Sequence, residues 1–398
     1  PGDPVARSQA MSRHATLVLL AALIGSAGPA LAQQAGQSEF REGERYRVGA
    51  GVPSDVIEAR AWYLKAAAKG HPMAQYQLGM IYNYGRGVPK DAAQAISWYK
   101  KAAAQGDASA ALELGEIYRF GRGVPADWNL AFPWMKQAAD AGEMLAILQL
   151  AKAYRYGWGT TKDLAKAREL FRIGADSGFS TAQYDLGVMY YSGEGMPANE
   201  REAVAWFRKS AAGQYGAGPA MRSLGFVYMN GRGGVGRDSA AGVDWYVKAA
   251  ENGDAPAQNY IGWLYETGTW TTKDLAQAEA WYRKAAQNDD PDGQFNLGRL
   301  LMYGIGREKD RYWGASWFQK AAEQGHTAAQ FHLSYSYFNG AGVLTDSVAG
   351  YKWLYLASTR DPKNQEYRTR LSEVDARVRG DLVARGTALA LEWLKRRG

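Results

Sequence analysis

The sequence predicts an all-α fold: a right-handed α/α superhelical solenoid of about nine helix-turn-helix repeats of 36 residues, with a C-terminal helical cap. The first observation is internal repetition, because the stretch Ala74–Gly106 (AQYQLGMIYNYGRGVPKDAAQAISWYKKAAAQG) returns along most of the chain. The second is the spacing of apolar residues within each copy, which is that of two amphipathic helices. Repetition at such a period indicates stacked helix pairs rather than separate globular domains.

One small residue in each copy measures the period. Successive steps are 36, 36, 36, 38, 37, 36 and 36 residues, between Gly79, Gly115, Ala151, Gly187, Gly225, Gly262, Gly298 and Ser334. A tryptophan recurs in the second half of the copies, with Leu170 filling one gap, at Trp62, Trp98, Trp134, Trp206, Trp245, Trp281, Trp317 and Trp353. One period before Gly79 lies Gly43, in a polar and degenerate first copy at residues 38–72.

Each copy reads as a helix A, a glycine-rich turn and a helix B. Ala74, Leu78 and Tyr82 form the apolar stripe of helix A, and Gly85 ends it by supplying left-handed backbone. An Asp or Asn in every copy is expected to cap helix B, at Asp55, Asp91, Asp127, Asp163, Asn199, Asp238, Asp274, Asp310 and Asp346. The recurring tryptophan is predicted to lie in the core.

The repeated motif resembles the Sel-like repeat family, relatives of the tetratricopeptide repeat. The residues that carry the resemblance are Leu78-Gly79-x-x-Tyr82-x-x-Gly85-x-Gly87 and the later WYKKAAAQG, and it extends over roughly Ser38–Asp361. The resemblance implies a scaffold that assembles complexes of other proteins. Some members of the family are rich in cysteine, whereas this chain has none.

Three regions are expected along the chain. Residues 1–32 comprise a short upstream stretch and a secretory signal peptide, whose apolar core 15–24 precedes an Ala-Leu-Ala cleavage site ending at Ala32. The repeat array occupies 33–361, and 362–398 reads as a basic pair of capping helices that covers the last repeat. The mature protein is therefore predicted to be exported, periplasmic or secreted, without a transmembrane segment.

The composition argues against catalysis and against bound cofactors or metals. The absence of cysteine excludes thiolate zinc sites and cysteine nucleophiles, and only four histidines occur. Gly231-x-Gly233-x-x-Gly236 matches a dinucleotide fingerprint but is one copy of the repeat turn and follows a helix. We expect a non-enzymatic protein that binds no nucleic acid; a cell-wall or β-lactam hydrolase is the distant alternative.

Function is expected where copies depart from the repeat. By analogy with tetratricopeptide repeats, the residue after the helix A glycine and the residue after its tyrosine face a concave groove. The predicted partner-binding residues are Glu116, Arg119, Lys152, Arg155, Tyr191, Phe226, Trp263, Tyr335 and Phe338. Large aromatic residues at such positions are typical anchors for a protein or peptide, and they can also stack on sugars. Peptidoglycan or an exopolysaccharide is therefore the alternative ligand.

Overall fold

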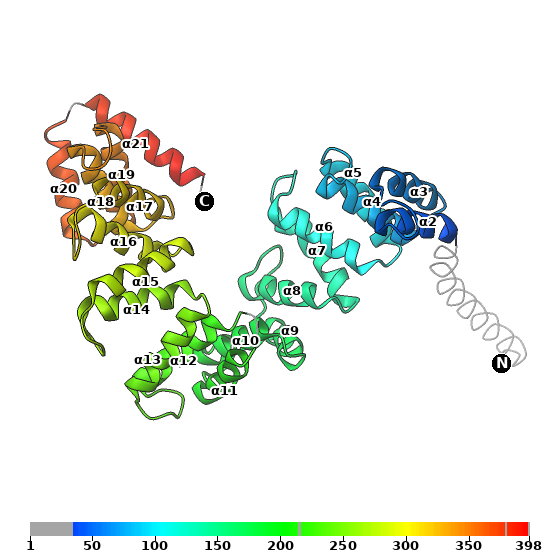
Figure 1. Ribbon diagram of the computed structural model, residues 1–398, viewed down its shortest axis with the longest axis horizontal. Helices are drawn as coiled ribbons and strands as arrows, with labels where there is room; N and C mark the ends of the chain where they lie inside the picture. Colours follow the sequence, from blue (N-terminus) through cyan, green and yellow to red (C-terminus); the bar gives the residue numbers. More distant parts are fainter. Residues whose placement is uncertain (1–34, 214–215, 379, 397–398) are drawn as a thin grey trace, which may run out of the picture. The chain divides into compact units, whose positions relative to one another are not determined.

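The computed structural model describes residues 35–213, 216–378 and 380–396, and these residues form helices and no strand (Figure 1). They divide into two compact units, an N-terminal unit that ends at Gly178 and a C-terminal unit that begins at Phe179. The predicted leader, residues 1–32, lies outside the described residues. None of the described helices is long and apolar enough to span a bilayer.

Antiparallel pairs of helices follow one another, so the protein is an all-α repeat solenoid as predicted. The A helices are α2 (Gln37–Val48), α4 (Pro72–Tyr84), α6 (Ala108–Phe120), α8 (Met144–Tyr156), α10 (Ser180–Ser192), α12 (Gly218–Asn230), α14 (Ala255–Thr267), α16 (Pro291–Tyr303) and α18 (Thr327–Asn339). The B helices are α3 (Val56–Ala68), α5 (Ala92–Ala104), α7 (Trp128–Asp140), α9 (Leu164–Asp176), α11 (Glu200–Ala211), α13 (Ser239–Glu251), α15 (Leu275–Gln287), α17 (Arg311–Glu323) and α19 (Ser347–Arg360).

Side-chain caps define the start of every B helix. In all nine repeats the predicted Asp or Asn is the N-cap, and its side chain accepts hydrogen bonds from free backbone amides of the first turn. Each such cap contributes about 1 kcal/mol to helix stability. The helix-capping prediction is confirmed in full.

The A helices begin less uniformly. Aspartate caps α6, α14 and α16, and the Nδ1 atoms of His71 and His326 take the same role at α4 and α18. No side-chain cap is present at the start of α2, where Gly36 stands, or at the starts of α8, α10 and α12, where Glu143, Phe179 and Ala217 stand. The first amides of these A helices therefore have no side-chain acceptor from the N-cap residue.

A glycine in helix A lets helix B approach closely. A Cβ atom at Gly79 would lie 2.5 Å from the Tyr99 ring, and one at Gly262 would lie 2.7 Å from the Tyr282 ring. Both rings are fully buried. In most repeats the residue after the recurring tryptophan is thus buried more deeply than the tryptophan itself.

Three of the eight recurring tryptophans are buried in the core as predicted (Trp206, Trp317 and Trp353), whereas the other five lie at its border and are partly buried (Trp62, Trp98, Trp134, Trp245 and Trp281). In six repeats the lysine three residues further along the helix places its ammonium over the ring, at 3.8–4.7 Å from the centroid, as in Trp62–Lys65 and Trp281–Lys284. A cation over an indole face is attracted by the ring's negative potential. Each of these lysines covers one face of its indole ring in the six repeats.

Helices α20 (Gln365–Asp375) and α21 (Gly380–Lys395) close the chain. Tyr367 of α20 lies one period after Phe331 and stacks on it with a centroid distance of 4.6 Å. Helix α20 therefore continues the A-helix pattern, whereas the sequence predicted that the period ends after Asp361. Helix α21 covers α19, because Gly386 packs against the buried ring of Tyr351.

Candidate partner-binding surface

The residue after the helix A glycine forms a row of side chains on successive A helices. The glycine faces the ring of helix B, so the next residue is turned away from helix B by about 100° on an α-helix. In the C-terminal unit this row contains Phe226 on α12, Trp263 on α14 and Tyr335 on α18, which are 44%, 42% and 52% exposed. We call these three residues the aromatic row.

The charged residues among the predicted partner-binding residues lie in the N-terminal unit, and two of them pair with each other. Glu116 and Arg119 on α6 form an ion pair at 2.9 Å, and Arg122 lies 3.9 Å from the same carboxylate. The guanidinium of Arg119 also lies 3.7 Å from the centre of the Phe120 ring. Burial raises the pKa of the neighbouring Glu113, and the charge of Arg122 opposes this shift. These contacts occupy the groups that were expected to meet a partner.

Lys152 and Arg155 lie on α8. Lys152 is half-buried, and Arg155 is only 6% exposed, so its guanidinium is not displayed on the surface. The guanidinium of Arg155 lies 5.3 Å from the centre of the Tyr156 ring. Sequence position alone placed Arg155 on the same face as Arg119, but the packing of the repeat buries it.

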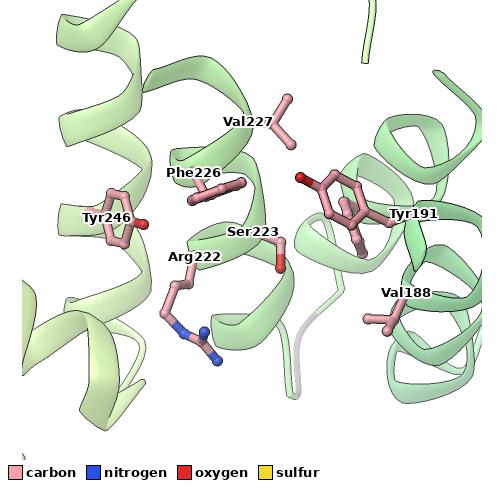
Figure 2. A pocket seen from close by; sticks show the side chains of 8 residues that line it. Val188, Tyr191, Arg222, Ser223, Phe226, Val227 and Tyr246 are labelled. Carbon is pink, nitrogen blue, oxygen red and sulfur yellow. The ribbon is translucent and has the colours of Figure 1, made fainter. Parts of the chain in front are cut away.

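Tyr191 and Phe226 meet in a pocket of about 190 Å³ in the C-terminal unit. The other lining residues come from four consecutive helices, α10 to α13: Val188, Phe207, Arg222, Ser223, Val227 and Tyr246. Figure 2 shows the Tyr191 hydroxyl directed toward the helix that carries Phe226, and the guanidinium of Arg222 at the other end of the pocket. Among the predicted partner-binding residues, Tyr191 and Phe226 are the ones that line this pocket.

The polar side chains of this pocket differ in their hydrogen bonding. Arg222 donates from Nε to the Asp254 carboxylate at 2.8 Å, and no described group bonds to its two terminal nitrogens. The Tyr191 hydroxyl is buried without a hydrogen-bond partner among the described residues, and burial raises the pKa of Tyr191 while the charge of Arg232 opposes it. Burial also raises the pKa of Tyr246 to about 12, so this hydroxyl stays protonated at neutral pH.

Trp263 extends the surface along α14. Its ring stacks on Tyr260 at 5.7 Å, and Tyr260 in turn contacts Tyr246 at 4.3 Å, so the ring is supported from the pocket side. Beyond it, Glu266 accepts from Tyr282 at 2.8 Å and pairs with Arg299 at 2.6 Å. A fixed ion pair therefore separates Trp263 from Tyr335 along the row.

Tyr335 and Phe338 lie on α18 in different environments. Tyr335 lines a larger pocket of about 630 Å³, together with Tyr303, His332 and side chains of α20. Phe338 is half-buried and packs against Gly350 and the cluster beneath the terminal helices. Because α20 continues the A-helix pattern, it covers Phe338, which is therefore not part of the open row.

The sequence did not single out Arg222 or His332. Arg222 lies four residues before Phe226, and this helical spacing is the signal that could have found it. His332 forms a 2.7 Å hydrogen bond with Tyr303, and burial lowers its pKa, which favours the neutral imidazole. Within the described residues no group of three or more potential ligands could hold a metal ion.

Comparison with known proteins identifies the repeat. The family model described as Sel1 repeat matches nine successive segments: 37–71, 72–107, 108–143, 145–179, 180–215, 218–254, 255–290, 291–326 and 327–362. No curated protein matches the chain.

Two solved structures are similar over most of their length. The crystal structure of a protective antigen present in uropathogenic Escherichia coli strains, displaying an SLR fold, is 33% identical. The match covers 90% of this chain and 84% of that chain, with a TM-score of 0.54. A Sel1 repeat protein from Oxalobacter formigenes is 28% identical, covering 78% of this chain and 90% of that chain, with a TM-score of 0.58.

Proposed function

Because the chain belongs to the Sel1 repeat family, whose proteins typically mediate protein–protein interaction, we propose that it is a non-catalytic scaffold that binds a segment of a partner protein. The proposed surface is the pocket of Tyr191 and Phe226 together with the neighbouring Trp263. The single observation that supports it is that these large rings remain exposed or border a cavity, although most aromatic positions of the repeat are packed.

The chemistry of the pocket favours a segment with an apolar side chain beside an acidic one. Rings of Tyr191, Phe226 and Tyr246 can contact the apolar side chain, and aromatic residues of this kind are common anchors in interfaces. The free terminal nitrogens of Arg222 can donate two parallel hydrogen bonds to a carboxylate. A helical or extended segment could present both groups.

The proposed location is the periplasm or the cell exterior, after cleavage at Ala32. The support is the order of a short basic stretch, an apolar core and small residues before the cleavage site. Osmotic-shock fractionation of the native host tests this location. Finding the chain with its leader still attached, in the cytoplasmic fraction, would refute it.

A crosslinking pull-down in the native host, followed by titration of the captured protein against the purified chain, tests the binding function. Phe226→Ala and Trp263→Ala are each expected to weaken binding about tenfold or more, the loss typical of a buried aromatic anchor. Leu145→Ala is the matched control, because Leu145 is an exposed apolar residue on an A helix outside the proposed surface. Equal affinity of all variants would exclude this surface.

Glycan binding remains the alternative, since the exposed faces of Trp263 and Tyr335 could also stack on sugar rings. The same variants are therefore assayed with purified sacculi and an immobilised acidic polysaccharide. Retention on either material that is lost in Trp263→Ala, without a captured protein partner, would replace the scaffold function with the glycan-binding one.

A further inference from the structure

Side chains of α16, α18 and α20 enclose the second pocket, which is separate from the pocket of Tyr191 and Phe226. Its volume of about 630 Å³ falls in the range of roughly 300–1,000 Å³ that is usual for small-molecule sites. The scaffold function proposed above makes no use of this pocket. Its two walls differ in chemistry, and the difference indicates what it can hold.

One wall is aromatic. It contains Tyr303 of α16 with Phe331 and Tyr335 of α18. Tyr303 and Tyr335 are 42% and 52% exposed, so their rings can meet a ligand. None of the described residues that line this pocket is aliphatic, whereas valines line the pocket of Tyr191 and Phe226.

His332 adds a neutral polar group to the aromatic wall. The Tyr303 hydroxyl lies 2.7 Å from Nδ1 of His332. Burial lowers the pKa of His332 and raises the pKa of Tyr303, so both side chains are neutral at pH 7. The hydroxyl can therefore donate to Nδ1, and the imidazole then carries its proton on Nε2, to which no described group bonds.

The other wall is one face of α20, and its lining side chains are polar: Gln365, Glu366, Thr369, Arg370 and Glu373. The carboxylate of Glu366 is exposed and bonds to no described group. Thr369 accepts from the Gln365 amide at 3.4 Å, which leaves its hydroxyl hydrogen free to donate. Arg370 pairs with Glu373 at 3.0 Å, and both side chains remain more than a third exposed. This wall therefore offers both donors and acceptors.

The charges around the pocket balance. Glu366 and Glu373 are negative, Arg370 is positive, and Arg368 lies beside the pocket on the same helix. On the aromatic wall His332 is neutral, and the nearby ion pair between α14 and α16 also sums to zero. Because neither sign of charge is in excess, the pocket favours a neutral ligand.

We propose that this pocket binds a neutral saccharide. The C–H face of a pyranose ring is apolar and packs on an aromatic ring, while each hydroxyl both donates and accepts hydrogen bonds. Tyr303 and Tyr335 supply the rings, and α20 supplies partners of both kinds. An aliphatic peptide anchor would find no aliphatic side chain to pack against here. The saccharide site shares no residue with the proposed protein-binding surface of Tyr191, Phe226 and Trp263.

Isothermal titration calorimetry of the purified chain with cellotetraose, maltotetraose and chitotetraose tests the proposal. We expect saturable binding of at least one of these neutral saccharides. Tyr335→Ala should weaken it about tenfold or more, the loss typical of an aromatic anchor, whereas Tyr335→Phe keeps the ring and should bind like the parent. Because Tyr335 is exposed, both variants should keep the thermal midpoint of the parent. Glu366→Gln removes a charged acceptor and should also weaken binding.

Trp263→Ala is the matched control and should bind the saccharide like the parent. Conversely, Tyr335→Ala should still bind any protein captured by the scaffold surface, so the two proposals can fail independently. The affinity should be nearly the same at about 50 mM and about 500 mM salt, because no net charge is neutralised.

Four results would overturn the saccharide site. They are no binding of any of the three saccharides, parent-like binding by Tyr335→Ala, a steep loss of affinity with salt, and tighter binding of tetragalacturonate, an acidic saccharide, than of every neutral one.

Discussion

The side-chain amide of Gln105 donates a hydrogen bond to Oε1 of Gln75 at 2.8 Å, and it also bonds to the carbonyl of Gly70 at 2.8 Å. Gln75 in turn reaches back to the carbonyl of Ala67 in the preceding repeat. The same arrangement joins Asn288 to Gln258 and Gln324 to Gln294. Hydrogen bonds to the buried side chains of Gln75, Gln258 and Gln294 therefore connect neighbouring repeats that otherwise meet mainly through apolar contacts.

Replacement of Gln105 by alanine should weaken the N-terminal unit. The substitution leaves Oε1 of Gln75, a residue only 5% exposed, without its donor, and an unsatisfied buried acceptor costs about 1–3 kcal/mol. Hydrogen exchange of the α4 and α5 amides should become faster accordingly. Gln277→Ala, an exposed glutamine on α15, is the control and should change exchange little. Unchanged exchange in Gln105→Ala would mean that the amide chain contributes nothing.

Arg360→Gln should stabilise the end of the array. Gln330 is fully buried and its Oε1 has no partner among the described residues, because Arg360 stands where three other repeats carry the amide donors Gln105, Asn288 and Gln324. A glutamine there would supply the donor, worth about 1 kcal/mol, against the partial loss of the contact between Arg360 and Trp393. Arg360→Ala loses that contact without supplying a donor, so it should lower the thermal midpoint. If both variants lower it equally, the orphaned oxygen is satisfied in another way.

Gly79→Ala should destabilise the second repeat by about 1–3 kcal/mol, because the added methyl overlaps a fully buried ring that cannot move aside. Chemical denaturation followed by circular dichroism measures the change. Gly236→Ala is the matched control: no atom lies within 4 Å of its added Cβ and its φ is not positive. That variant should be neutral or slightly stabilising. Comparable losses in both would show that close helix approach is not the reason for Gly79.

The N-terminal unit should lose stability in mild acid through His71. Nδ1 accepts from the amide of Ala74 at 3.3 Å and Nε2 lies 3.0 Å from Gln37, while burial lowers the pKa of His71 below its usual value. The unfolded chain then binds more protons than the folded one, so stability falls as the pH drops below about 6.5 and through the folded-state pKa.

Thermal midpoints of the parent between pH 7.5 and 5 should therefore fall by more than those of His71→Asp. The aspartate is the cap that α6, α14 and α16 already use at this position, so the variant keeps its cap in this range. Parallel pH profiles of the two proteins would exclude His71 as the titrating group.

The fold was predictable because the repeat recurs along the chain. The role of α20 was not, because the residues after Asp361 no longer follow the repeat. Asp or Asn occupies the same position in all nine copies, and this recurrence identified the residue as a helix cap, because a residue type that recurs in every repeat serves the repeat's structure. No copy-to-copy comparison could show that α20 prolongs the A-helix row, because only Tyr367 keeps the register and its other residues differ. The sequence predicted a helix here only as part of the cap, so it did not show that α20 covers Phe338.

The candidate surface was predictable only in part. The sequence placed Phe226 after the helix A glycine and Tyr191 after the helix A tyrosine, two series of positions expected to face one groove, and the two residues line one pocket. Arg155 could not be predicted in this way. It follows the helix A tyrosine, as Arg119 does in its own repeat, but the neighbouring side chains bury it. Trp270 is visible as a departure from the repeat in the sequence alone, because glycine stands at the equivalent turn position in the eight other copies.

The uncapped starts of α8, α10 and α12 have a mechanical consequence. A linear array pulled from its ends transmits the load through each repeat in turn, and it yields where the local free energy of opening is smallest. Three successive A helices in the middle of this chain lack the side-chain cap that α4 and α6 before them and α14, α16 and α18 after them possess. Under tension the repeats that begin with α8, α10 and α12 should therefore open before these capped neighbours.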